Sequence, residues 1–183
     1  MHFAEVCLIA YNKFTMAQLR KEHHLEISSQ PALFAAVPPA EISDLLRQTL
    51  ANQTEIAIRS GSEKARSEYL IAPILSEVYE QSRDHANLFS GVEFVVDKKS
   101  GLTGYCDFLV TLAPRTIELL APVISVVEAK KEDIPKRIPQ CLAELVAAQI
   151  FNAAEDRSVD TLYGIVTNGE VWTFLRMQGR LSP

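Results

Sequence analysis

The chain has 183 residues, of which 48% are hydrophobic, 22% charged and 8% aromatic, a composition typical of a single globular domain and unlike that of disordered or collagen-like chains. Its net charge of −5 argues against a general affinity for nucleic acid, because autonomous nucleic-acid binders usually carry a basic excess. The longest uncharged run, residues 27–40, contains three prolines and is shorter than the roughly 20 apolar residues of a membrane span. The N-terminus lacks the basic segment of a signal peptide, and the three cysteines form no CxxC pair, so we expect a cytoplasmic protein with no membrane segment.

The first 59 residues have weak hydrophobic periodicity. Short helices are expected over residues 16–23 and 40–50, separated by the proline-bearing stretch 28–39. We predict that residues 1–59 form a mostly helical extension packed on a core of residues 60–183, within one structural domain. The adjacent residues His23 and His24 point to different helix faces, so they are not expected to share a metal ion.

A helix of about six turns is predicted over residues 60–83. Ser60 and Glu63 have the spacing of a capping box at its start. Pro73 should kink the helix, because proline lacks a backbone donor and crowds a preceding carbonyl. Glu68 shares a predicted face with Ile71 and Leu75, so its carboxylate should face the core, where it needs a partner.

Five strands and one more helix follow. Residues 91–97 and 105–112 are predicted to form a hairpin, and residues 123–130 a third strand. A helix is expected over residues 138–154, with Pro139 in its first turn, where proline is tolerated. The dipeptide Asn168-Gly169 lies between two β-rich runs and predicts a terminal hairpin. This mixture of elements indicates an α/β fold.

Charged side chains interrupt the apolar pattern of the second and third strands. Asp107 alternates with apolar neighbours, so it is expected on the opposite sheet face from Cys106 and Phe108. Glu128 and Lys130 lie two residues apart at the end of a mostly apolar strand, and therefore share a face. A structural ion-pair network between helix and sheet is the alternative explanation of these charges. A second acid-x-lysine triplet, Asp97-Lys98-Lys99, adjoins a turn and is interpreted as a solvated hairpin tip.

A helix with Glu68, a strand with Asp107, a strand with Glu128-Ala129-Lys130, then a helix and a strand together resemble the PD-(D/E)xK nuclease superfamily. Five segments are similar to the N-terminal nuclease domain of type I restriction R subunits: SEYLIAPILSEV, GYCDFLV, VVEAKKED, QCLAELVAAQ and YGIVTNGEVWTF. The resemblance implies a restriction-endonuclease-like αβββαβ core with a mixed central sheet flanked by helices. Cys106 stands where the name-giving proline would be.

The resemblance also implies a set of site residues: Glu68, Asp107, Glu128, Lys130 and Gln140. Asp107 and Glu128 would bind metal, Lys130 would complete the site, and the other two would support it. Carboxylate oxygens suit Mg²⁺ or Mn²⁺, and such an ion lowers the pKa of a bound water. The last helix also offers Gln149, so the choice of glutamine stays open.

The expected function is Mg²⁺-dependent hydrolysis of phosphodiester bonds in DNA, in a restriction or defence context. The alternative is a non-catalytic module that keeps this fold and binds nucleic acid, a partner protein or a second copy of the chain. The acidic net charge favours the module, whereas the complete set of acids and lysine favours the enzyme. Trp172 and Phe174 share a strand face and could stack on bases, although aromatic residues in a terminal hairpin more often pack into a core.

Overall fold

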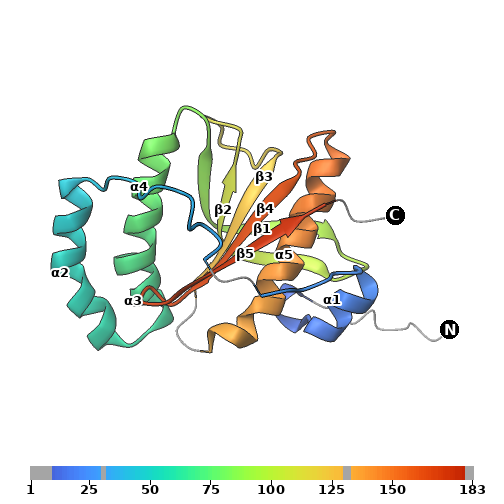
Figure 1. The fold of residues 1–183 in the computed structure, drawn as a ribbon, viewed down its shortest axis with the longest axis horizontal. Coiled ribbons are helices and arrows are strands. Elements are labelled where there is room, and N and C mark those ends of the chain that lie inside the picture. The colour runs from blue at the N-terminus through green and yellow to red at the C-terminus, as the bar shows by residue number, and fades with distance from the viewer. Residues whose placement is uncertain (1–9, 30–31, 130–132, 180–183) are drawn as a thin grey trace.

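A five-stranded sheet forms the centre of the computed structural model, which describes residues 10–29, 32–129 and 133–179. Its strands are β1 (Asn87–Asp97), β2 (Leu102–Thr111), β3 (Val123–Ala129), β4 (Thr161–Thr167) and β5 (Trp172–Gln178). They lie side by side in sequence order, and every neighbouring pair is antiparallel except β3 and β4, which are parallel. The fold is therefore α/β with a mixed, open sheet (Figure 1).

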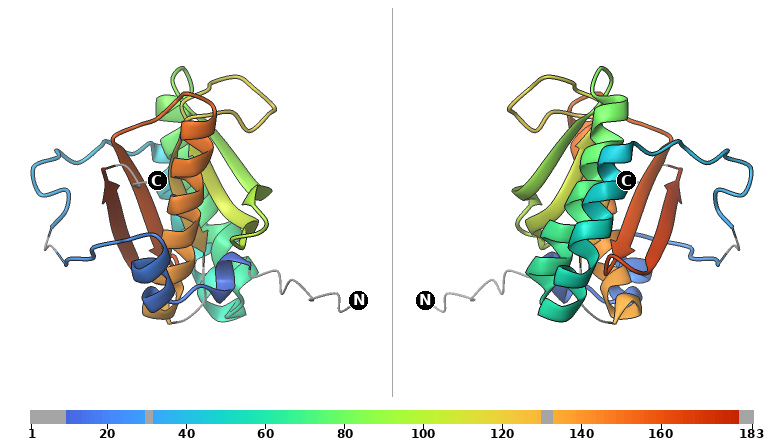
Figure 2. Two further views of the ribbon diagram at one scale, coloured as in Figure 1. Left: turned by 90° about the vertical axis from the view of Figure 1, so that its right-hand side faces the viewer. Right: turned by 90° about the vertical axis from the view of Figure 1, so that its left-hand side faces the viewer.

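Helices cover both faces of this sheet, as the views from either side show (Figure 2). The α5 face carries α5 (Ile134–Ala154), α1 (Met16–Glu22) and the short turn η1 (Tyr11–Lys13). The α4 face carries α4 (Ala72–Ser82), with α2 (Asp44–Ser60) and α3 (Glu63–Arg66) beside it. None of the helices in the described part of the chain is long and apolar enough to cross a membrane.

The second helix, α2, begins four residues later and ends ten residues later than the predicted segment 40–50, and tertiary contacts fix its start. Ser43 caps it by accepting a hydrogen bond from the Leu46 N–H, and the Ser43 hydroxyl donates to Glu77 of α4 at 2.7 Å. The helix continues to Ser60 and ends at Gly61, whose φ of 61° is left-handed. The predicted capping box at Ser60 is therefore wrong: Ser62 caps α3 by accepting from the N–H of the third helical residue.

A π turn, η2 (Ser67–Ile71), connects α3 to α4 directly before Pro73. Proline has no N–H to offer the preceding turn, and here the Ala72 N–H reaches back five residues to the Ser67 carbonyl. Such a wide turn rotates the side chains after it relative to the positions that they would have in a regular α-helix. Glu68 is accordingly exposed and pairs with Lys64, so the prediction that Glu68 faces the core is wrong.

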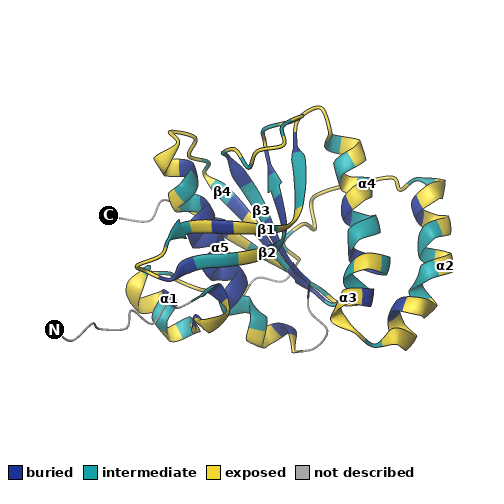
Figure 3. Cartoon of the chain, turned by 180° about the vertical axis from the view of Figure 1, so that it is seen from behind, coloured by how far each residue is buried: buried dark blue, intermediate teal, exposed yellow. Residues whose placement is uncertain are grey.

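The hairpin of β1 and β2 starts earlier than predicted, at Asn87, and turns sharply part-way along its length (Figure 3). The strand bends at Gly91, which has a left-handed φ of 63°. Gly91 lies opposite Asp107, because the pairs on either side of it, Ser90 with Phe108 and Val92 with Cys106, keep the same register. Strict alternation fails here, because Cys106 packs on the α5 face while Phe108 packs on the α4 face. The prediction that these two neighbours share a face is therefore wrong, and Asp107 sits at the bend between them.

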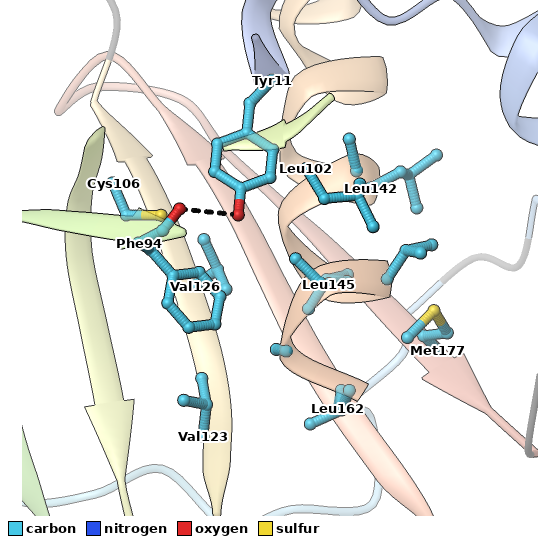
Figure 4. Packing of buried hydrophobic residues seen from close by; sticks show 14 of the residues in the cluster. Tyr11, Phe94, Leu102, Cys106, Val123, Val126, Leu142, Leu145, Leu162 and Met177 are labelled. Atoms are coloured by element: carbon cyan, nitrogen blue, oxygen red, sulfur yellow. Dashed lines mark hydrogen bonds between the residues drawn. The ribbon is translucent and has the colours of Figure 1, made fainter. Parts of the chain in front are cut away.

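The larger core fills the space between α5 and the sheet (Figure 4). Tyr11 of η1 is buried in it, and its hydroxyl donates a hydrogen bond to the Phe94 carbonyl at 2.9 Å. Gly104 makes room for this ring, since a Cβ there would lie 2.9 Å from the Tyr11 ring. Tyr11, Phe14 and Leu19 thus complete the core of the α5 face.

Helix α5 begins at Ile134, four residues before its predicted start, with Pro135 in the first turn and Pro139 inside the helix. Its middle approaches the sheet closely at Gly164 of β4. A Cβ on Gly164 would lie 2.8 Å from the Cys141 sulfur and 2.9 Å from a Leu145 methyl. Glycine is therefore required for α5 to pack at this distance.

Asn152 joins the end of α5 to the start of β3 through two buried hydrogen bonds of 2.7 Å, one from the Val123 N–H and one to the Val123 carbonyl. We expect Asn152→Ala to lower the free energy of unfolding by about 2–4 kcal/mol, because two buried backbone groups lose their partners. Urea denaturation measures this difference. Asn52→Ala on the exposed side of α2 is the control and should change stability by less than about 0.5 kcal/mol. Equal effects of the two substitutions would contradict the argument.

Candidate active site

Asp107 and Glu128 meet where β2 and β3 separate. The Asp107 Oδ2 atom accepts a hydrogen bond of 2.8 Å from the N–H of Ala129, the residue that follows Glu128. This bond places the Asp107 carboxylate against the backbone at the end of β3. Two acids 21 positions apart in sequence (107 and 128) are thereby brought to one place in the fold.

Glu128 points toward α5 and is completely buried. Its neighbours Val127 and Ala129 pack in the cluster of the α4 face, and Val126 packs in that of the α5 face. Because successive strand residues alternate between faces, Glu128 projects with Val126 toward the helix. A carboxylate in this position needs polar or charged partners.

Glu144 of α5 is such a partner and is also completely buried. Burial raises the pKa of Glu144 well above its usual value, and the charge of Glu128 and a hydrogen bond with it raise the pKa further. Gln140, one turn earlier, donates to Glu144 at 3.1 Å. The raised pKa favours the protonated form of Glu144 beside Glu128, and the nearby Asp107 adds to the effect.

Two buried thiols and a phenol surround the acids and keep their environment nonpolar. Burial is the main cause that raises the pKa of Cys106 and of Cys141, and the charges of Glu144 and Glu128 raise both further. Burial likewise raises the pKa of Tyr11, with smaller effects from Cys106 and Glu144. All three stay uncharged, so they offer little screening of the repulsion between carboxylates.

The predicted site residues divide into three groups. Asp107, Glu128 and Gln140 come together around Glu144. Glu68 instead extends into solvent beside Lys64, with half of its side chain exposed. Lys130 lies outside the described residues.

Gln149, the other candidate glutamine, lies elsewhere on α5. Its amide nitrogen donates to the Gly179 carbonyl just after β5, at 2.5 Å. Gln140 is thus the glutamine in contact with the acids.

Glu144 is the site residue that sequence reasoning missed. It is the single charged residue in the segment QCLAELVAAQ, and a lone acid within an apolar helical stretch predicts a buried carboxylate. The same signal drew attention to Glu68, where the π turn made it misleading. Tyr11 gave no comparable signal, because its segment has no clear periodicity.

The donor set is suited to a hard cation. Its oxygen atoms come from Asp107, Glu128, Glu144 and the Gln140 amide, the ligand types that Mg²⁺ and Mn²⁺ prefer. Within residues 10–29, 32–129 and 133–179, no three His, Cys, Asp or Glu side chains are arranged to enclose an ion.

No family model matches this chain, and no curated protein or solved structure matches it.

Proposed function

We propose that the chain is a metal-dependent nuclease that hydrolyses phosphodiester bonds in DNA and has a PD-(D/E)xK core. The hydrogen bond from the Ala129 N–H to Asp107 supports this most strongly, because it brings two acids together immediately before Lys130. The arrangement of a helix, three antiparallel strands, α5 and a strand parallel to β3 supports it as well.

In this proposal Asp107 and Glu128 hold a Mg²⁺ or Mn²⁺ ion through their carboxylate oxygens. The ion supplies a water of lowered pKa and neutralises charge that develops on the phosphate. Gln140 orients Glu144, and protonated Glu144 holds the Glu128 side chain without adding a second full negative charge beside it. Lys130 contributes a positive charge that stabilises the transition state.

DNA is the substrate in this proposal, and a cytoplasmic location suits the free thiols of Cys106 and Cys141. The acidic net charge favours a restricted contact with DNA around the site over a wide basic surface. The same acidity supports the competing function, a module that keeps the fold and cleaves nothing.

Lys130→Ala separates the two functions. We expect the wild type to cleave linear, supercoiled or single-stranded DNA with Mn²⁺, and the variant to bind DNA normally but cleave at least about a hundredfold more slowly, because transition-state stabilisation is lost. Lys99→Ala, in the other acid-x-lysine triplet, is the matched control and should cleave normally. A wild type that cleaves none of these substrates supports the module, and equal cleavage by wild type and Lys130→Ala would refute the assignment of Lys130.

A further inference from the structure

Strand β5 has a free edge, because it is the last strand of the sheet. Two hydrogen bonds fix which backbone groups point outward: Asn168 N–H to the Val171 carbonyl at 3.3 Å, and Gly179 N–H to the Asp160 carbonyl at 3.4 Å. In an antiparallel ladder, directly opposed residue pairs alternate between hydrogen-bonded and non-bonded. Both of these bonds join directly opposed pairs at the two ends of the β4–β5 ladder, so the odd-numbered residues of β5 bond to β4 and the even-numbered residues do not. The N–H and C=O groups of four residues of β5 therefore point away from β4: Trp172, Phe174, Arg176 and Gln178.

The segment between α1 and α2 passes outside this edge, as Figure 2 shows for its described residues, 23–29 and 32–43. No backbone hydrogen bond joins the described residues of this crossing segment to β5. Contact is made by the Phe34 ring, whose centre lies 5.8 Å from that of Tyr163 and 5.3 Å from that of Phe174. Residues 23–29 and 32–43 thus approach the edge without forming backbone hydrogen bonds to its outward-pointing groups.

A groove of about 480 Å³ lies between the crossing segment and β5, which is within the range of about 300–1,000 Å³ of known ligand sites. Residues 23–28 form one wall and residues 174–179 the other, and Ile138 and Leu142 of α5 line it as well. The groove therefore combines apolar side chains, interspersed with polar ones, with a row of outward-facing backbone groups.

We propose that this groove binds an extended peptide from a partner protein, which adds as a sixth strand to the free edge of β5. Addition of a strand would satisfy the outward N–H and C=O groups. Leu175 and Met177 pack on the α5 face, so the peptide residues opposite them should be apolar. The peptide residue opposite Phe174 lies on the other face and should be aromatic or aliphatic.

Charge complementarity specifies a further position of the peptide. Arg176 is exposed and forms no ion pair with any residue that the structure describes. The ionisable side chains of the groove are Arg176, His23 and His24 against a single acid, Glu26. An Asp or Glu of the peptide opposite Arg176 would therefore gain a cross-strand ion pair.

Nucleic acid suits this groove less well than a peptide. Arg176 is the only permanently charged cation among the lining residues, and residues 27–40 of the crossing segment contain no charge. Binding of a phosphate backbone requires several cations, whereas binding of a strand requires backbone groups and apolar pockets.

A display library of random heptapeptides, selected against the full chain, tests the proposal. We expect enrichment of alternating apolar residues with an acid two positions from an aromatic or aliphatic residue. The most enriched peptide is then synthesised with a twin that is N-methylated at the nitrogens facing β5. The parent should bind and slow hydrogen exchange of the Phe174, Arg176 and Gln178 amides at least tenfold, whereas the twin should do neither.

Gln178→Pro and Gln178→Ala form a matched pair for the protein side. Proline is tolerated on an edge strand where its missing N–H faces solvent, so Gln178→Pro should melt like the wild type yet bind the peptide at least tenfold more weakly. Gln178→Ala keeps the N–H and should bind normally. Absence of enrichment, or equal binding of the N-methylated twin, would overturn the proposal whether or not the proline variant folds. Protection of the same amides without peptide, rising with protein concentration, would also overturn it by identifying a second copy as the occupant.

Discussion

Asp107→Asn is expected to reduce metal-dependent DNA cleavage at least about a thousandfold, equivalent to about 4 kcal/mol of transition-state stabilisation. The substitution removes the negative charge that attracts the cation and one of its oxygen ligands. It retains a side-chain oxygen that can accept the hydrogen bond from Ala129, now 2.8 Å long. The site should therefore be lost while the junction of β2 and β3 is kept.

Titration calorimetry measures the affinity for Mn²⁺, cleavage assays measure the rate of DNA hydrolysis, and thermal melts measure the stability of the fold. Asp97→Asn is the control, since Asp97 belongs to the other acid-x-lysine triplet and caps an exposed turn through Ser100. That variant should bind Mn²⁺ and cleave DNA like the wild type. If Asp107→Asn binds Mn²⁺ with unchanged affinity, Asp107 is not a metal ligand and the proposed site is wrong.

Glu144→Gln is expected to make the protein more stable than the wild type at pH 7.5 in the presence of EDTA, and about equally stable at pH 4. Burial, followed by the nearby Glu128, raises the pKa of Glu144 in the folded chain, whereas the unfolded chain has the ordinary value near 4.3. As the pH rises above about 4.3, the unfolded state releases its proton while the folded state retains it. The wild type therefore loses about 1.4 kcal/mol of stability per pH unit until the pH reaches the folded pKa.

A glutamine side chain does not titrate in this pH range, and it can still form hydrogen bonds with Gln140 and Glu128. The free energy of unfolding of the variant should therefore exceed that of the wild type by at least about 1.4 kcal/mol at pH 7.5. The other ionisable groups that act on Glu144, Glu128 of β3 and Asp107 of β2, are present in both proteins. Urea denaturation from pH 4 to 8 gives the two curves. Glu55→Gln on α2, where the acid is exposed beside Arg59, should follow the wild type. Parallel curves for Glu144→Gln and the wild type would show that Glu144 does not hold a buried proton.

Local sequence signals were sufficient for several elements. The helix predicted over residues 16–23 is confirmed as Met16–Glu22, where Thr15 and Gln18 form a capping box. The hairpin predicted around Asn168-Gly169 is confirmed by the antiparallel pairing of β4 and β5. The α/β class is confirmed as well. These features depend on residues close together in sequence, whose caps, turns and apolar periods act within one element.

The tertiary structure decided in which direction the charged side chains point and which residues they contact. Glu68 and Glu144 carry the same sequence signal, a lone acid on an apolar helical face. The π turn before Pro73 exposes Glu68, whereas the close approach of α5 to Gly164 keeps Glu144 buried beside Glu128. The bend at Gly91, opposite Asp107, likewise breaks the alternation on which the strand prediction relied. Side-chain direction in these places depends on a wide turn within a helix, a bend within a strand and a contact between distant segments, and a regular periodic pattern describes none of the three.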